Sequence, residues 1–177
     1  MTPYSGMLPG LIAGHYGFEQ THIDLVKLSL WANVRFIQDK VIAIDAEAKT
    51  LTLANRPEIE FDVVSIDTGS TPNKSIKGSA EYSTSVKPIS DFYARWKLIE
   101  ERASQQEINS LAVVGGGAGS VEVILAAASK LQKLNPALQF HLITGADDIL
   151  SGYNRAVITR VKQQFDKYHI SLHSSAR

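Results

Sequence analysis

Residues 113–120 have the sequence Val-Val-Gly-Gly-Gly-Ala-Gly-Ser, and this stretch decides the fold that we expect. It continues an apolar run that begins at Leu111, and a segment rich in alanine follows it. A buried strand that turns on glycine into a helix is the arrangement that holds the pyrophosphate of a dinucleotide. Gly115 would make the tight turn, Gly117 would let the backbone approach the phosphates, and Ser120 stands where the motif has its third glycine.

The turn is therefore our candidate site for a nicotinamide dinucleotide, NAD or NADP, because the first N–H groups of the helix would face the anion. The candidate residues are Gly115, Gly116, Gly117, Ala118, Gly119 and Ser120. The alternative is that the glycines only let a strand turn sharply into a helix. The Ser120 side chain could push the helix outward or give a phosphate one more donor, and the sequence leaves both open.

The choice between NAD and NADP depends on the end of the second strand, where an acidic residue would bind a ribose 2′-hydroxyl or an arginine would accommodate a 2′-phosphate. This sequence has Thr144 and Gly145 there, with Asp147 and Asp148 beyond. Either aspartate could reach the ribose, or both could cap a turn. We include Thr144 in the candidate site and leave the nucleotide preference open.

Working outward from the turn, strands and helices alternate, which predicts a βαβαβ unit with a parallel sheet and right-handed crossovers. The expected strands and helices cover residues 111–114, 120–134, 140–144, 153–168 and 170–172. Before them, a helix is expected after Pro88, because proline is tolerated in a first helical turn. Its apolar side chains would share one face: Phe92, Trp96, Ile99 and Ala103.

The N-terminal half has different patterns. Residues 1–14 contain Gly, Pro and apolar side chains without a regular period, which predicts an apolar loop. Thr21 and Asp24 have capping-box spacing, and apolar residues recur at helical intervals to about Asn33, which predicts a helix. Three strand-like runs follow, at residues 34–44 with a break near Asp39, 50–53 and 60–66, which predicts an antiparallel meander.

Residues 67–85 are rich in Gly, Ser, Thr, Pro and Asn, as in a connection between domains. We therefore divide the chain into residues 1–80 and 81–177.

The composition excludes several classes of function. The 18 Lys and Arg balance the 18 Asp and Glu without a block of like charge, so no nucleic-acid partner is expected. The absence of cysteine excludes disulfides and thiolate chemistry, so any redox step belongs to a cofactor. No apolar run approaches the roughly 20 residues of a membrane span, so we expect a cytoplasmic protein. No catalytic residue and no metal ligand is nominated.

Two segments resemble the pyridine nucleotide-disulfide oxidoreductase superfamily, together with the glycine turn. The first is Thr-Pro-Tyr-Ser-Gly-Met-Leu-Pro-Gly at residues 2–10 with Ala13-Gly14, and the second is Phe-Asp-Val-Val-Ser-Ile-Asp-Thr-Gly-Ser-Thr-Pro at residues 61–72. Within this superfamily the chain most resembles type II NADH dehydrogenase-like flavoproteins. It is most similar to the flavoprotein module fused to some selenide, water dikinases.

The resemblance implies that residues 1–80 are a partial FAD-binding segment and residues 81–177 a Rossmann-like NAD(P)H-binding domain, shortened at its C-terminus. It implies that Thr68 and Gly69 lie beside the FAD phosphates, and that the backbone at Val41 contacts the adenine. Residues 4–9 would approach the isoalloxazine. An alternative for Val41, Met7, Leu8 and Leu11 is ordinary packing. The family's FAD glycine turn and its C-terminal segment have no counterpart in this sequence, so we expect an internal fragment.

Three hypotheses for function remain. In the first, the parent protein passes hydride from NAD(P)H to FAD and then to an acceptor such as a quinone, and this fragment binds the nicotinamide nucleotide but is deficient in FAD. In the second, the chain is a nucleotide-binding module without electron transfer. In the third, it is a structural piece that forms a homodimer through the faces left by truncation.

Overall fold

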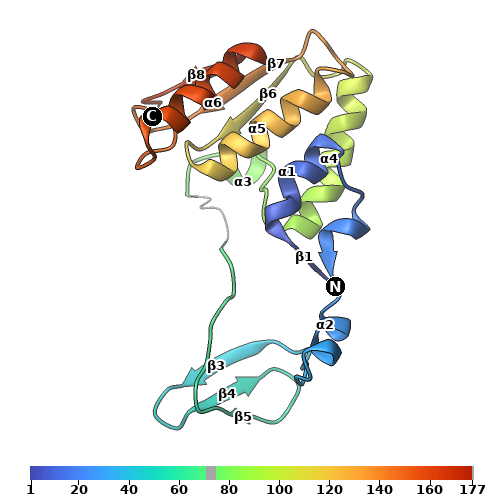
Figure 1. Ribbon diagram of the computed structural model, residues 1–177, viewed down its shortest axis with the longest axis vertical. Coiled ribbons are helices and arrows are strands. Elements are labelled where there is room, and N and C mark those ends of the chain that lie inside the picture. The colour runs from blue at the N-terminus through green and yellow to red at the C-terminus, as the bar shows by residue number, and fades with distance from the viewer. Residues whose placement is uncertain (71–74, 177) are drawn as a thin grey trace. The chain divides into compact units, whose positions relative to one another are not determined.

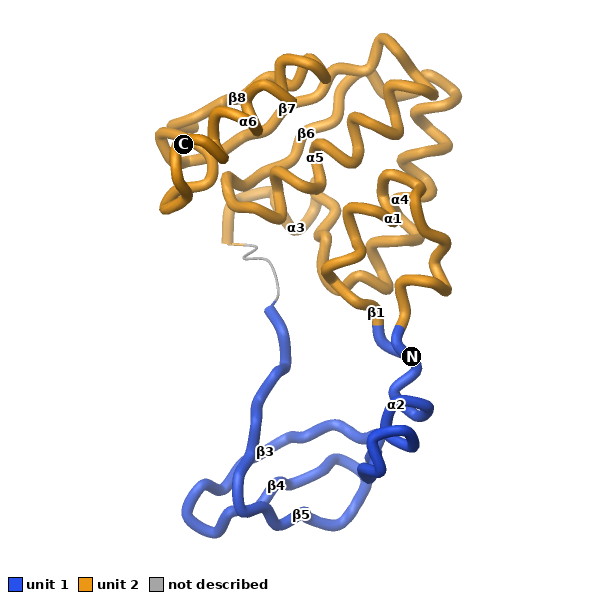
Figure 2. Tube along the Cα trace, viewed as in Figure 1, with its two compact units in different colours: residues 1–2, 23–71 blue, residues 3–22, 72–177 orange. Residues whose placement is uncertain are grey.

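The computed structural model describes residues 1–70 and 75–176. By its internal contacts the chain divides into two compact units (Figure 2). Unit 1 contains residues 1–2 and 23–71, and unit 2 contains residues 3–22 and 72–177. Residues 71–74 of the predicted connection, including Thr71 and Pro72 of the segment used for the resemblance, lie outside the described residues, as does Arg177.

Unit 2 contains the expected βαβαβ arrangement. Strands β6 (Ser110–Val114), β7 (Gln139–Ile143) and β8 (Ile170–His173) form a parallel sheet in the order β6-β7-β8. The crossovers are helices α5 (Ala118–Leu131) and α6 (Arg155–Lys167), which lie on one side of the sheet (Figure 1). The α/β fold class predicted from the sequence is confirmed, and the element ends differ from the prediction by a few residues.

The core of unit 2 lies between this sheet and its helices. Alternate strand side chains such as Phe140, Leu142 and Ile170 are buried against them, as the two-residue period of a strand requires. Helix α5 is buried along much of its length, with Ile124 and Leu131 fully enclosed. A helix with so many small apolar side chains can pack against strands and helices at once, which fixes the start of α5 relative to the end of β6.

Helix α4 (Ile89–Ser104) matches the amphipathic pattern upstream. Phe92, Trp96 and Ala103 are buried, and Ile99 packs at the edge of the same core. Pro88 is the N-cap residue, one position before the first helical turn where the sequence placed it. A four-residue helix, α3 (Ser79–Tyr82), occurs within the segment that we predicted to be an irregular connection.

The prediction of a loop at residues 1–14 was wrong. Strand β1 (Thr2–Pro3) is followed by a 3-10 turn, η1 (Ser5–Met7), and by helix α1 (Leu8–Ala13). Pro9 lies in the first turn of α1, and Gly14 ends the helix with a φ of 79°. Leu8, Leu11 and Ile12 are buried, and α1 packs against α5. Their burial supports the packing alternative for Leu8 and Leu11.

The helix predicted at residues 21–33 is shorter than expected. Residues 19–23 form a 3-10 turn, η2 (Glu19–Thr21), and strand β2 (His22–Ile23), which pairs with β1. Helix α2 (Leu25–Trp31) begins after Asp24, whose carboxylate accepts hydrogen bonds from Val26 N and Lys27 N at 3.0 and 3.1 Å. Asp24 is therefore the N-cap itself, which ends the capping-box interpretation.

The antiparallel meander is confirmed with shorter strands, β3 (Val41–Asp45), β4 (Thr50–Leu53) and β5 (Ile59–Glu60), in the order β3-β4-β5. Residues 34–40 and 61–66 are not strands. The carboxylate of Asp39, where we expected a break, accepts hydrogen bonds from Lys40 N, Asn55 N and Asn55 Nδ2. These bonds tie the chain before β3 to the residues after β4, so the segment ahead of Asp39 does not continue the ladder.

Candidate functional site

The candidate site begins where β6 ends. Gly115 has a φ of 131°, a conformation that side chains rarely allow, and its N–H still donates to Ile143 O at 2.8 Å. Gly116 O accepts from Leu150 N at 2.7 Å, so the loop after β7 is bonded to the turn. Gly117 has an extended backbone and is the N-cap of α5. The turn thus joins β6, α5 and the loop after β7.

The four glycines of the turn have different surroundings. A Cβ on Gly115 would collide with the Ser120 hydroxyl, and a Cβ on Gly116 would lie 2.5 Å from Thr144 Oγ1. A Cβ on Gly117 or Gly119 would meet no atom within 4 Å. Two glycines are therefore required by packing within the turn, whereas the other two leave open space at the start of α5.

The Ser120 side chain turns back onto Gly115. This contact places Ser120 at the junction of strand and helix, which is the packing role of the motif's third position. Beyond Gly117, the N–H groups at the start of α5 have no intrahelical acceptor, as in any helix, and they carry the positive end of the helix dipole. The open space beside Gly117 and Gly119 lies against these donors.

Thr144 follows β7 and is buried. Its Oγ1 accepts from Ala146 N at 3.2 Å, and its N–H donates to His173 O at 2.8 Å. Together with its contact to Gly116, these bonds make Thr144 a support for the turn. The sequence suggested its position but not this contact, which requires β6 and β7 to be neighbours.

The two aspartates beyond Thr144 both have partners. Asp147 accepts from the Ser175 hydroxyl at 2.8 Å. Asp148 accepts from Lys162 Nζ at 2.7 Å and from Ile149 N at 2.8 Å. The hydrogen bond from Lys162, followed by that from Ile149, lowers the pKa of Asp148 below its usual value. The loop therefore carries an ionised carboxylate bound to a lysine.

The predicted contacts with the FAD phosphates and adenine lie in unit 1, whereas residues 4–9, predicted to approach the isoalloxazine, lie in unit 2. Val41 begins β3 and is 47% exposed, and Thr68 and Gly69 are exposed on the segment that follows the meander. Gly69 has a φ of 73° and open space around its Cβ position. Their exposure leaves these residues accessible, but it does not form a cavity for a flavin.

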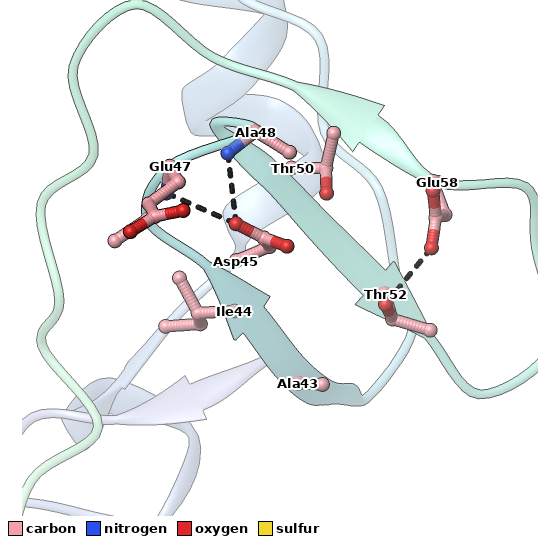
Figure 3. A pocket seen from close by; sticks show the side chains of 9 residues that line it. Ala43, Ile44, Asp45, Glu47, Ala48, Thr50, Thr52 and Glu58 are labelled. Carbon is pink, nitrogen blue, oxygen red and sulfur yellow. Dashed lines mark hydrogen bonds between the residues drawn. The ribbon is translucent and has the colours of Figure 1, made fainter.

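A shallow hollow in unit 1 lies beside the turn between β3 and β4 (Figure 3). Its polar groups serve the meander: Asp45 caps the turn by accepting from Glu47 N and Ala48 N, and Thr52 Oγ1 donates to Glu58 at 3.0 Å. The hollow does not include the glycine turn or the predicted FAD contacts. We therefore assign it no function.

The parallel sheet and the glycine turn define the class of α/β proteins with a dinucleotide-binding fold. The chain belongs to the pyridine nucleotide-disulphide oxidoreductase family, whose sequence profile matches residues 1–177. The superfamily identified from the sequence is thereby confirmed. Proteins that resemble the chain include sulfide-quinone reductases, an NDH2 and a water-forming NADH oxidase, which are oxidoreductases.

Individual relatives match with lower identity. A sulfide-quinone reductase from Aquifex aeolicus (strain VF5) is 34% identical over 87 residues, which are 48% of this chain and 20% of the relative. The solved sulfide:quinone oxidoreductase of Aquifex aeolicus is 23% identical, with a TM-score of 0.81 and coverage of 98% of this chain and 42% of that one. NDH2 from Plasmodium falciparum is 18% identical, with a TM-score of 0.79 and coverage of 97% and 40%.

The chain thus spans less than half the length of these relatives. NDH2, at 18% identity, shows the fold alone, so the NADH dehydrogenase-like branch and the likeness to the selenide, water dikinase module remain predictions. No helix within residues 1–70 and 75–176 is long and apolar enough to cross a membrane.

Proposed function

We propose that this chain carries the nicotinamide-nucleotide site of an FAD-dependent NAD(P)H oxidoreductase, in which hydride passes from NAD(P)H to FAD and then to an acceptor such as a quinone. The observation that carries the proposal is the open space at Gly117 and Gly119, beside the first turn of α5. A pyrophosphate needs backbone without side chains at this place and N–H donors behind it. Residues 81–177 would form the nucleotide domain and residues 1–80 part of the FAD domain.

The chain's residues would bind and orient the nucleotide. The N–H groups from Ala118 to Ser120 would donate to the pyrophosphate, helped by the helix dipole. The contacts of Gly115 with Ser120 and of Gly116 with Thr144 would hold the turn in place before the ligand arrives. A bound reduced nicotinamide supplies a hydride, and this chemistry needs no acid or base from the protein.

We propose that the site distinguishes NADH and NADPH weakly. Thr144 stands where an acidic residue would bind the ribose 2′-hydroxyl, and a threonine has no carboxylate. Its side chain is buried, and its hydroxyl accepts a hydrogen bond from Ala146 N. Asp148 is neutralised by Lys162, which could also face a 2′-phosphate. We expect dissociation constants for the two nucleotides that differ by less than about tenfold, or 1.4 kcal/mol. A larger preference for either nucleotide would contradict this part of the proposal.

The experiment is calorimetric titration of the 177-residue protein with NADH and with NADPH. Saturable binding of at least one nucleotide supports the proposal, and no binding at millimolar concentrations would remove it. The isolated adenine and ribose parts, as adenosine and adenosine 2′-monophosphate, serve as ligands without the pyrophosphate. They should bind much more weakly if the glycine turn supplies the main contact.

Flavin content tests the second part of the proposal. Val41, Thr68 and Gly69, the contacts predicted for the FAD adenine and phosphates, are exposed, so we expect the protein to purify without colour. A flavin absorbance spectrum with stoichiometric FAD would contradict this expectation. Nucleotide binding without FAD, and without NADH oxidation when FAD is added, would favour the alternative of a nucleotide-binding module.

A further inference from the structure

Two histidines meet on the sheet of unit 2, away from the covered face. His141 lies on β7 and His173 on β8, and in this parallel pair His141 is the partner of Ser171 while Ile143 is the partner of His173. Residues 171 and 173 point to the same side of β8, because successive side chains alternate along a strand. His141 and His173 are therefore diagonal neighbours on one face of the sheet.

This face is opposite the one that packs on α5 and α6. On the covered face, the side chains that alternate with the histidines are buried in the core: Phe140, Leu142 and Ile170. On the histidine face, the exposed side chains include Ala112, Val114 and His173. His141 is half-buried at the centre of the sheet. Solvent and ions can therefore reach the pair in the part of the chain that the structure describes.

The ring nitrogens of the pair converge. His141 Nδ1 and His173 Nε2 are 3.1 Å apart, and the ring planes are tilted by 46°. A tetrahedral zinc with bonds of 2.0–2.1 Å holds two nitrogens roughly 3.3 Å apart, and ligands at right angles are closer, at about 2.9 Å. The observed separation lies between these values, so the distance between the two nitrogens suits one shared metal ion.

We propose that His141 Nδ1 and His173 Nε2 form a two-nitrogen site for a divalent late transition metal ion, Zn²⁺, Ni²⁺ or Cu²⁺, whose remaining positions hold water. Imidazole is a preferred ligand of these ions. In the neutral pair, a proton on one of the two facing nitrogens makes the hydrogen bond between the rings. When the metal ion binds, this proton moves to the other nitrogen of the same ring. Two metal–nitrogen bonds then replace one hydrogen bond and two metal–water bonds, without any redox change.

The site links the two C-terminal strands of the sheet. Among the described residues, β8 lies at the edge of the parallel sheet and pairs only with β7. An ion held by both strands binds the folded protein more tightly than the unfolded chain, so it should raise the unfolding temperature. The proposal does not depend on nucleotide binding, because the pair is formed by different residues from the glycine turn.

The test is calorimetric titration of the metal-free protein with ZnCl₂ and NiCl₂, with MgCl₂ as a cation that prefers oxygen ligands. We expect saturable binding of Zn²⁺ and Ni²⁺, and none of Mg²⁺. H141Q and H173Q should each weaken Zn²⁺ binding on the order of 100-fold. Each variant loses one of the two nitrogens, and in the parent chain the second nitrogen binds at a high effective concentration because it belongs to the same molecule. His15 and His169 are exposed histidines elsewhere, so H15Q and H169N should leave the affinity unchanged.

Circular dichroism tests whether each variant is folded. If H141Q is unstable, H173Q alone tests the proposal, because it changes an exposed residue near residue 177. Zn²⁺ should raise the unfolding temperature of the parent chain and of H15Q but not that of H173Q. The proposal is wrong if the parent chain shows no saturable Zn²⁺ binding, or if H173Q binds Zn²⁺ as tightly as the parent chain does.

Discussion

At the scale of single residues, the contact between Gly116 and Thr144 holds the glycine turn. Thr144 is buried, and its Oγ1 and Cβ lie 2.5 and 3.1 Å from where a Cβ on Gly116 would be. The backbone at Gly116 does not have the positive φ that favours glycine, and the three atoms nearest to an added Cβ all belong to Thr144, which is therefore the main obstacle to a side chain. A turn supported in this way would need little ordering on binding the proposed nucleotide.

We predict that G116A lowers the free energy of unfolding by about 1–3 kcal/mol, because the added methyl group overpacks a rigid site. The same substitution in a T144A background should cost less, since the hydroxyl at 2.5 Å is gone and only the Cβ at 3.1 Å remains. Urea unfolding of the four proteins measures this double-mutant cycle. Equal costs in both backgrounds would show that Thr144 is not the obstacle.

The residue roles in the turn could be predicted only in part. The glycine spacing after an apolar strand indicated Gly115 as the turn and Gly117 as the open position, because these roles depend on local sequence. The support from Thr144 and the bond from Leu150 to Gly116 depend on β6 and β7 being adjacent, which no local pattern specifies. Whether Thr68, Gly69 and Val41 contact a flavin stays a prediction.

At the scale of elements, helix α1 is the part of the fold that the sequence concealed. Its six residues include Pro9 and Gly10, which normally interrupt helices, and they are too few to reveal a period. The helix is stable because Leu8, Leu11 and Ile12 are buried, and this packing is tertiary. The strands and helices from residue 110 onward were predictable because each is long enough to show its own period.

Ile12 tests the packing of α1. Its side chain is fully buried in the core that α5 helps to form, so I12A should lower the free energy of unfolding by about 2–5 kcal/mol, whereas I12V should cost about 0.5–1.5 kcal/mol. Chemical denaturation of both variants measures the difference. If I12A cost no more than I12V, α1 would not be anchored as the structure shows.

At the scale of the whole molecule, the two units differ in how much core they contain. The buried hydrophobic cluster consists of residues of unit 2. Among the described residues of unit 1, Leu53 is the only buried hydrophobic side chain, while Val41, Ile42 and Ile44 on β3 are exposed. Burial of apolar surface is the main stabilising contribution to folding, so the units should differ in stability.

We predict that amide hydrogens of β3 and β4 exchange faster than those of β6 and β7 by a factor of 100 or more, equivalent to about 2.7 kcal/mol of opening free energy. Native-state hydrogen exchange followed by mass spectrometry resolves the two groups of peptides. Comparable protection in both would mean that unit 1 is stabilised by more than its own described contacts.

G119A tests whether the start of α5 binds the pyrophosphate of a nicotinamide nucleotide. Gly119 lies in the first turn of α5 with open space around its Cβ position, so alanine should raise the free energy of unfolding by up to about 1 kcal/mol. The same methyl group would occupy the space for the phosphates. We predict that calorimetric NADH affinity falls by about tenfold or more while stability rises. Unchanged NADH affinity in a stabilised G119A protein would contradict the account.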